Sequence, residues 1–458
     1  MASIGTRKQS LIPFLLLVLL VLFGGALAVG FFLFFEGAPP KLAITSPTAY
    51  LSRSGTIVVS AQDDESGLRH VQLHITQGDR QQELYGEDFA RKGYTGMVGT
   101  PKKTVEITFD PTNSAFADGP ATISVTAADY SFRGFFAGNR VTTSQEVIID
   151  TTAPQISILY SDRYVSPGGS GLVIYRVNDR TATSGVEIND TFHPGFPVND
   201  QQPEVFAALF ALSYEAQGIE GARVTAADQA GNRTTAPFTP TFKAVQFKQD
   251  RITLDDRFLE TKIPEFQNYY KEMQGTLLEQ YLYINNQVRD SNNQTISDLC
   301  GKPQGQRLWR THLSRMPGSP RAGFADHRTY YYNGEAIDKQ VHLGIDIAST
   351  QQAEVRAAAA GTVVHADYLG IYGNMVLLDH GQGLFTLYSH LSQIDVAVGQ
   401  SVEHEARLGA TGTSGMAGGD HLHFSVLING IFVTPVEWWD PHWVQVNIDE
   451  PLQETLFH

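Results

Sequence analysis

Two short histidine-containing motifs could together bind a metal ion. The first has the sequence HLGID at residues 342–346, and the second has the sequence HLH at residues 421–423. Two imidazoles and one carboxylate form a zinc-binding set that leaves the fourth tetrahedral position free for water. A single histidine on an apolar strand is more often structural than ligating. The combination, however, predicts a metal site with hydrolytic chemistry.

The elements that carry these motifs must bring them together. Residues 421–428 alternate between polar and apolar types, so the imidazoles of His421 and His423 are expected on one face of a strand. In a straight strand His342 and Asp346 would be roughly 13 Å apart, at about 3.3 Å per residue. Ligands at ~2 Å from one zinc ion cannot be so far apart. We therefore expect a bend between them, which the conformational freedom of Gly344 would allow.

Three separated segments carry a family resemblance. Residues 341–348, 387–392 and 419–424, with the intervening 361–364 and 372–376, resemble the lysostaphin/LytM-type zinc endopeptidases of bacterial cell walls. The resemblance extends from about Phe324 to about Pro435. It implies peptidoglycan peptides as the substrate.

The resemblance also implies roles for five residues. His342, Asp346 and His423 would bind zinc, whereas His390 and His421 would be catalytic and act on the substrate and the water. Some relatives have lost ligands and only activate other hydrolases. All five positions are intact in this chain, which favours catalysis.

The region around the motifs, residues 321–445, is predicted to be a LytM-type peptidase domain made mostly of antiparallel sheet. Short strand-like runs at 361–366, 375–378 and 384–388 are separated by glycine turns. Residues 411–419 are too rich in glycine for a strand and predict a loop that forms one wall of the cleft. No Lys-Ser/Thr and helix follow this loop, so a nucleotide site is excluded.

The amino end predicts a transmembrane signal anchor at residues 11–35. This segment has no charged residue, and as a helix it would span about 37 Å, enough to cross a hydrocarbon core of ~30 Å. A cleaved signal peptide, with its shorter apolar region of about 7–15 residues, is the alternative. Arg7 and Lys8 predict that residues 1–10 stay in the cytoplasm and that the remainder is extracytoplasmic, in the periplasm.

An internal repeat predicts two immunoglobulin-like β-sandwiches, at residues 38–150 and 151–243. Residues 125–129 (VTAAD) recur at 224–228, and the sequence AGNR occurs at 137–140 and again at 230–233. The offset of about one hundred residues is the size of such a sandwich. We interpret the pair as a spacer without a ligand of its own. A calcium site at residues 63–65 is the less favoured alternative to an acidic turn.

Residues 244–320 are predicted to be a helical linker. Pro264 fits a first helical turn, an apolar stripe follows from Phe266 to Val288 at steps of three and four, and residues 292–294 would end the helix. The stripe could form a coiled-coil dimer, but packing on a neighbouring domain of the same chain is the more frequent outcome. Residues 301–320 would be an irregular connection.

Charge and cysteine content narrow the choice of partners. A formal net charge of −15 argues against nucleic acid. Five arginines, at positions 307, 310, 315, 321 and 328, could contact an acidic wall polymer or lipid headgroups, although a solvated loop is the preferred interpretation. The single cysteine, Cys300, cannot form an internal disulfide.

Together these features predict a mainly β, membrane-anchored, extracytoplasmic zinc metalloendopeptidase that hydrolyses peptide cross-links of peptidoglycan. The first alternative is a non-catalytic wall-binding regulator that activates another hydrolase, and the second is a structural tether between membrane and wall. The partners expected are the peptidoglycan peptide, the membrane, and either a second copy of the chain or a regulatory protein.

Overall fold

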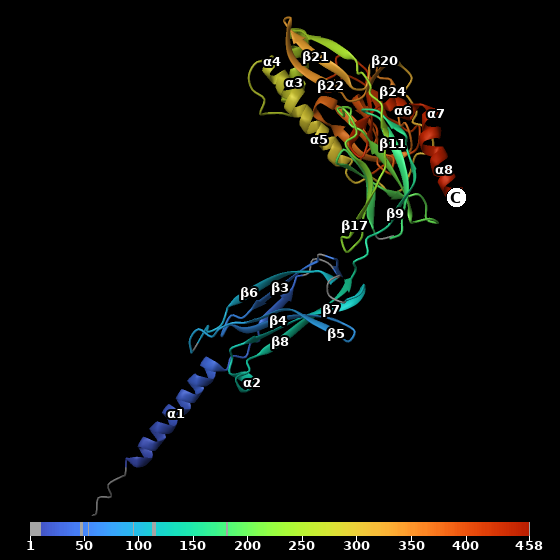
Figure 1. The fold of residues 1–458 in the computed structure, drawn as a ribbon. Coiled ribbons are helices and arrows are strands. Elements are labelled where there is room, and N and C mark those ends of the chain that lie inside the picture. Colours follow the sequence, from blue (N-terminus) through green and yellow to red (C-terminus); the bar gives the residue numbers. More distant parts are fainter. Residues whose placement is uncertain are drawn as a thin grey trace, which may run out of the picture. The chain divides into compact units, whose positions relative to one another are not determined.

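The chain is mainly β, as predicted, and forms two compact units (Figure 1). The computed structural model describes residues 11–45, 49–53, 55–94, 96–111, 116–179 and 182–457. One unit contains residues 1–153 with 229–232, and the other contains residues 154–228 with 233–458.

An apolar helix, α1 (Ile12–Phe34), begins the described chain. Its 20-residue core has a mean hydropathy of 2.8, so it is long and apolar enough to cross a membrane. A signal sequence near an amino terminus meets the same criterion. Arg7 and Lys8, on which the predicted orientation depends, lie outside the described residues.

The first unit contains two mainly antiparallel sheets around one core. The core residues include Ile57, Leu73, Ile75, Ile123 and Val125, which alternate with more exposed residues as expected for strands with one face buried. The sheets have the strand orders β1-β3-β6 and β2-β8-β7-β4-β5, in which β2 and β8 are the one parallel pair. The elements are β1 (Lys41–Ile44), β2 (Tyr50–Leu51), β3 (Gly55–Gln62), β4 (Leu68–Gln77), β5 (Arg80–Asp88), β6 (Lys102–Phe109), β7 (Gly119–Asp129), α2 (Arg133–Phe136) and β8 (Arg140–Ile149).

The acidic turn at residues 63–65 is held by its own backbone. Asp63 accepts hydrogen bonds from the amides of Glu65 and Gly67, at 3.2 and 2.6 Å. Its carboxylate also lies close to those of Glu36 and Asp129. Burial, the hydrogen bond with Asp129 and the charge of Asp63 raise the pKa of Glu36 to about 8. Glu36 is therefore protonated at neutral pH, which relieves the repulsion among these three groups.

The second unit begins with two four-stranded antiparallel sheets, whose strand orders are β14-β15-β11-β9 and β13-β12-β16-β17. Two short strands, β10 and β18, pair beside them. The strands are β9 (Ile156–Ser161), β10 (Tyr164–Val165), β11 (Ser170–Val177), β12 (Thr183–Ile188), β13 (Thr191–Pro194), β14 (Phe196–Pro197), β15 (Val205–Ala211), β16 (Ala222–Ala227), β17 (Arg233–Pro237) and β18 (Thr241–Phe242). Neither pair of sheets establishes an immunoglobulin-like identity, which stays a prediction.

The helical region differs from the single helix that the sequence predicted. It contains α3 (Asp256–Gln267) and, after a break, a continuous helix made of α4 (Leu277–Tyr283), a π-helical turn (Ile284–Val288) and α5 (Arg289–Leu299). Pro264 lies inside α3 rather than in a first turn, and residues 292–294 lie within α5 rather than at its end.

Helix caps explain the position of Pro264 and the break between the helices. The carboxylate of Asp255 caps α3 by accepting from the amide of Phe258, and the helix starts at Asp256, eight residues before Pro264. Thr276 and Glu279 form a capping box that starts α4. The apolar stripe is buried within the second unit, through Phe266, Tyr281 and other residues. It therefore packs on its own domain, as preferred, rather than forming an exposed coiled-coil seam. Cys300 is buried directly after α5.

The last part of the second unit is built on a ten-stranded antiparallel sheet. Its main path is β20-β23-β30-β27-β26-β25-β28, with β24, β29 and β31 beside it. A separate three-stranded sheet, β19-β21-β22, carries the chain into it; Figure 1 shows β21 and β22 beside helices α3–α5. These strands are β19 (Gln249–Leu254), β20 (Ser319–Ala322), β21 (Asp326–Tyr332), β22 (Glu335–His342), β23 (Ile345–Ala348), β24 (Glu354–Arg356), β25 (Gly361–Tyr368), β26 (Asn374–Asp379), β27 (Leu384–Ile394), β28 (Ser401–Val402), β29 (Arg407–Thr411), β30 (Leu422–Ile428) and β31 (Ile431–Val433). Helices α6 (Pro435–Trp439), α7 (Pro441–Val444) and α8 (Glu450–Phe457), with a π-helical turn at Gln445–Asp449, end the described chain.

Candidate metal and catalytic site

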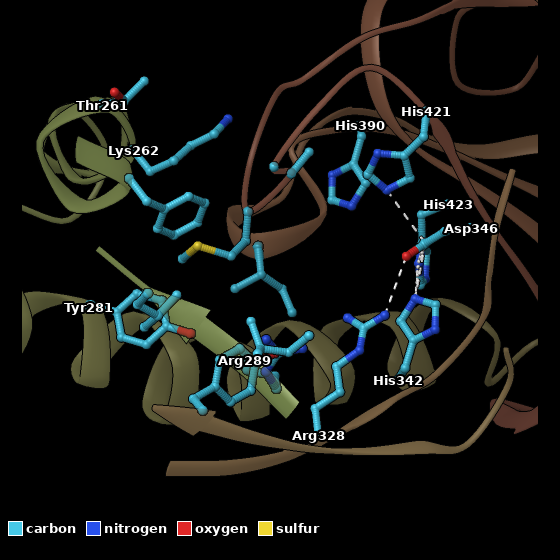
Figure 2. A pocket seen from close by; sticks show the side chains of 18 of the residues that line it. Thr261, Lys262, Tyr281, Arg289, Arg328, His342, Asp346, His390, His421 and His423 are labelled. Carbon is cyan, nitrogen blue, oxygen red and sulfur yellow. Dashed lines mark hydrogen bonds and ion pairs between the residues drawn. The ribbon is translucent and has the colours of Figure 1, made fainter. Parts of the chain in front are cut away.

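Three side chains from three strands meet at one point. His342 ends β22, Asp346 lies in β23, and His423 lies in β30 directly opposite Asp346 in the register of the sheet. His342 Nε2 lies 2.9 Å from His423 Nδ1 and 3.0 Å from Asp346 Oδ1, and His423 Nδ1 lies 3.0 Å from the same carboxylate oxygen. The two motifs are thus brought together as the sequence predicted (Figure 2).

The bend between His342 and Asp346 is a change of sheet. β22 belongs to the three-stranded sheet and β23 to the ten-stranded sheet. Gly344, in the intervening turn, is not in the left-handed region that favours glycine. A Cβ at this position would lie only 2.6 Å from His423 Nε2 and 2.7 Å from the carbonyl of Phe424. Glycine is therefore required for space, not for the backbone freedom that the sequence suggested.

Outer hydrogen bonds define which ring nitrogens face the centre of the cluster. His342 Nδ1 donates to the carbonyl of Gly323 at 2.8 Å, which leaves its Nε2 as an acceptor. Ser425 Oγ donates to the carbonyl of Leu343 at 2.7 Å, so it accepts from His423 Nε2 at 3.1 Å and leaves Nδ1 as an acceptor. Carbonyl and hydroxyl partners of this kind orient the histidines of metal sites.

The donor set therefore fits a divalent metal ion. Two imidazole lone pairs and one carboxylate oxygen converge within 3.0 Å, where they would repel one another without a cation between them. Burial lowers the pKa of His423 to about 4, so its ring is neutral near pH 7, as a metal ligand must be. Burial alone would raise the pKa of Asp346, but its contacts with His342, His421 and His423 hold it well below its usual range.

Arg328, on β21, completes the surroundings of the carboxylate. Its guanidinium donates to Asp346 Oδ2 at 3.3 Å, whereas Oδ1 faces the two histidines. The expectation that this arginine lies in a solvated loop is wrong, because its side chain is only 19% exposed. The run of threonine and tyrosine that follows it was the available signal for a strand.

His390 and His421 lie beside this cluster (Figure 2). Their ring centroids are 4.9 Å apart, and His390 is 5.7 Å from the ring of His423. His390 Nδ1 donates to the carbonyl of Ser414 at 2.9 Å, and His421 Nδ1 donates to that of Gly419 at 2.7 Å. His390 therefore keeps Nε2 as an available acceptor, whereas His421 Nε2 lies 3.4 Å from Asp346 Oδ1 and pairs with it.

The backbone and charge environment of the two histidines differ. His390 has a φ of +62° within β27, a conformation that costs energy in a residue with a Cβ and is frequent at functional sites. Burial and the neighbouring histidines lower its pKa well below the usual value. For His421, burial acts in the same direction, but the hydrogen bond to Asp346 outweighs it and raises the pKa.

All five predicted residues line one cavity of about 630 Å³. One wall is the loop between β29 and β30, through Met416, Ala417 and Gly418, as predicted for the glycine-rich segment. Other lining residues come from the helical region, including Thr261, Lys262 and Arg289 (Figure 2). No pattern in the sequence indicated that this region reaches the cleft.

Comparison with known proteins identifies the segment that carries the cluster. Residues 340–435 match the model of peptidase family M23. This segment is an M23 peptidase domain. The M23 domain includes His342, Asp346, His390, His421 and His423, whereas Gly323, Arg328 and helix α3 lie before it in the sequence.

Two relatives and one solved structure illustrate the similarity. DD-carboxypeptidase/endopeptidase Mpg of Neisseria meningitidis is 41% identical over 97 residues, which are 21% of this chain and 22% of that protein. Murein hydrolase activator EnvC of Escherichia coli is 32% identical over 139 residues, 30% of each protein. The lysostaphin catalytic domain of Staphylococcus simulans is 26% identical and has a TM-score of 0.23, covering 27% of this chain and 92% of that domain. The chain thus spans about a fifth of the length of the first of these relatives.

Proposed function

We propose that this chain is a membrane-anchored zinc endopeptidase that hydrolyses peptide cross-links of peptidoglycan outside the cytoplasm. The observation that carries the proposal is the convergence of three acceptor atoms, from His342, Asp346 and His423, beside the rings of two further histidines, His390 and His421, in one cavity. The M23 domain and the names of its relatives support the peptide bond and the wall as targets.

In this proposal His342, Asp346 and His423 hold zinc, which when bound supplies a Lewis acid that lowers the pKa of water and polarises a peptide carbonyl. Arg328 orients Asp346 through Oδ2 and leaves Oδ1 to face the metal position. Gly323 and Ser425 keep the two ligand rings in the required tautomers.

His390 and His421 handle the protons. In the neutral ring, each Nε2 can accept a proton from the attacking water, and in the charged ring it can donate to the oxyanion or to the departing amine. The lowered pKa keeps His390 neutral, so that its Nε2 lone pair is free for the water, and the raised pKa of His421 favours the charged ring that stabilises negative charge.

The rest of the chain would deliver the domain to its substrate. We propose that residues 11–35 anchor it in the membrane, that residues 38–150 and 151–243 act as a spacer, and that residues 321–445, positioned by the helical linker at 244–320, carry out the reaction. The length and hydropathy of α1 support an anchor.

A non-catalytic regulator is the second candidate, because the chain is similar to the activator EnvC. An activator needs a binding cleft but no ligand set. The complete set of five residues, with the outer hydrogen bonds of the ligands also in place, favours the enzyme.

Metal analysis and wall digestion test the proposal together. His342→Ala, Asp346→Ala and His423→Ala should each lose zinc after equilibrium dialysis. His390→Ala and His421→Ala should keep zinc but lose wall-peptide cleavage by ~10²-fold or more. His442→Ala is the matched control, since that histidine is exposed and lies on α7, away from the cleft residues.

The outcomes separate the candidates. Zinc retained in all three ligand variants would refute the metal assignment. Zinc lost in His421→Ala but kept in His423→Ala would exchange their roles. If the unmodified protein binds zinc and wall fragments but never cuts them, the regulator is the correct function.

Topology is tested on cells with a permeabilised outer envelope. Added protease should degrade the catalytic domain, and carbonate washing should leave the protein in the membrane fraction. Recovery of soluble exported protein with an amino terminus near Val29 would show that α1 is a cleaved signal instead.

A further inference from the structure

Helix α3 holds the loop that forms one wall of the cleft. Lys262 Nζ donates a hydrogen bond to the carbonyl of Thr413, and Glu265 accepts one from the amide of Gly415 at 2.6 Å. The two side chains are one turn apart on the helix and also pair with each other, at 3.7 Å. The helix therefore forms hydrogen bonds with the loop at Thr413 and at Gly415, the two neighbours of Ser414.

Ser414 lies between these two points and contacts the catalytic histidine. Its carbonyl accepts the Nδ1–H of His390 at 2.9 Å. Its hydroxyl accepts from the amide of Asn374 at 2.9 Å and donates to the carbonyl of Leu391 at 2.8 Å. The hydrogen bonds of the hydroxyl hold Ser414 in place. The bonds from α3 to the carbonyl of Thr413 and the amide of Gly415 hold the two adjacent peptide groups, and with them the direction of the Ser414 carbonyl.

The loop needs such restraint because its sequence provides little. Gly412, Gly415, Gly418 and Gly419 give it a wide range of backbone conformations, and ordering each residue costs roughly 1–2 kcal/mol. A Cβ at Gly418 or Gly419 would have no neighbour within 4 Å. The two glycines are thus loosely surrounded. The next residue, Asp420, is held by Thr411 Oγ1 at 2.6 Å and by the amide of Gln352 at 3.0 Å, and the contacts with α3 hold the Thr413–Gly415 end.

We propose that Lys262 and Glu265 are positioning residues for His390. They hold the Ser414 carbonyl in the direction that keeps the proton of His390 on Nδ1, so that Nε2 faces the metal position. This inference rests on the proposed function for the catalytic role of His390, but the contacts themselves do not. Neither residue lies within the M23 domain, and they are separated from their loop partners by about 150 positions.

Direct binding of the substrate is the alternative role for Lys262, and the same variants test it. Lys262 also lines the cavity, and Figure 2 shows its side chain extending from α3 toward the side occupied by His390 and His421. A lysine that bound substrate directly would affect KM. A lysine that positions the loop affects kcat and the state of His390.

The test uses the full-length, zinc-loaded protein with ¹⁵N-labelled histidine and four variants. Glu265→Ala removes the acceptor for Gly415, whereas Glu265→Gln keeps an amide oxygen at the same place. Lys262→Met removes the donor but keeps an apolar stem of similar length. Glu260→Ala, at an exposed position on the same helix, is the matched control.

Glu265→Ala and Lys262→Met should each lower kcat by about tenfold to a hundredfold, with KM and zinc content unchanged. The His390 Nδ1–H signal should weaken or move, and amide exchange at Gly415 should accelerate by at least about tenfold. Glu265→Gln should retain most of the activity and the His390 signal, and Glu260→Ala should match the unmodified protein.

An unchanged His390 signal and unchanged Gly415 exchange in both variants would overturn the proposal. A rise in KM alone for Lys262→Met would overturn it for that residue. If Glu265→Ala proves unfolded, the measurements on Lys262→Met and Glu265→Gln still test the positioning role. If the unmodified protein cleaves nothing, the proposed function fails, while the ring-nitrogen and exchange measurements still show whether α3 holds His390.

Discussion

The two repeated regions have similar sequences but different partners. Residues 125–129 lie in β7 and their repeat at 224–228 lies mostly in β16, so the same five letters form a central strand in both places. The first region has a core of its own. In the second, one face of β11 and β15 packs within its own sheets, through Val173 and others. The other face packs on the peptidase, where Leu172 joins a cluster with Val426 and Trp438.

This difference shows what a sequence repeat can reveal. The repeat indicates a strand, but the partner of each face depends on the residues of other strands. All seven residues of β15 are buried, the pattern of a strand covered on both faces. We therefore expect the second region to be part of the catalytic unit and the first to be separable from it.

The largest expected effect comes from deletion. A chain that starts at Pro154 should fold, bind zinc and cleave like the full protein. A chain that starts at Ala244 should aggregate or melt at a much lower temperature, because it uncovers the apolar face around Val426 and Trp438. Size-exclusion chromatography and thermal denaturation distinguish them. A soluble monomer from the shorter chain with the same Tm would refute the shared core.

Next in size is the removal of one aromatic side chain from that core. Trp438 is fully buried, and its indole donates to Ser170 Oγ at 2.9 Å. Trp438→Ala should lower the free energy of unfolding of the second unit by about 3–5 kcal/mol. Ile75→Ala, in the core of the first unit, is the counterpart and should leave zinc content and cleavage unchanged. Equal loss of cleavage in both variants would contradict the separation.

The carboxyl group of Glu437 should make this contact depend on pH. Burial raises its pKa to about 7, against the opposing hydrogen bonds from Ser170. Since the folded state keeps the proton after the unfolded chain has lost it, stability should fall as pH rises between about 4.5 and about 7. The total change should be at most about 3 kcal/mol. Glu437→Gln should flatten this part of the curve of Tm against pH; an unaltered slope would exclude this group as its source.

The smallest expected effect concerns the side chain of one turn residue. Asn429 Nδ2 donates to the carbonyl of Leu209 at 3.1 Å and lies 3.2 Å from His193 Nδ1, and the φ of +51° suits the turn between β30 and β31. Asn429→Gly should keep the turn but lose these side-chain contacts, at a cost of about 1 kcal/mol. Asn429→Ala should cost more, because it also strains the turn. Chemical denaturation of both variants separates the two contributions, and equal losses would show that the turn geometry is unimportant.

The sequence predicted local features of the site better than distant ones. Alternation in residues 421–428 predicted that His421 and His423 project to the same side, because a strand repeats every two residues, and both rings do contact Asp346 Oδ1, at 3.4 and 3.0 Å. Arg328 and Glu265 could not be found in this way, since their contacts join separate elements without any periodic pattern. Asp255, a residue type that favours the N-cap position, indicates the start of α3. The prediction instead assigned Pro264 to the first turn of the helix, although it lies inside α3.

The buried position of the single cysteine has a practical consequence. Cys300 lies in an apolar core, and burial raises the pKa of its thiol, so it should react slowly with thiol reagents in the folded protein. The natural chain can therefore serve as a background for site-specific labelling. A cysteine introduced at the exposed Tyr94 would carry a fluorophore or a membrane-impermeant reagent at one known position. Such a label would report the orientation of the protein in intact cells without further substitutions.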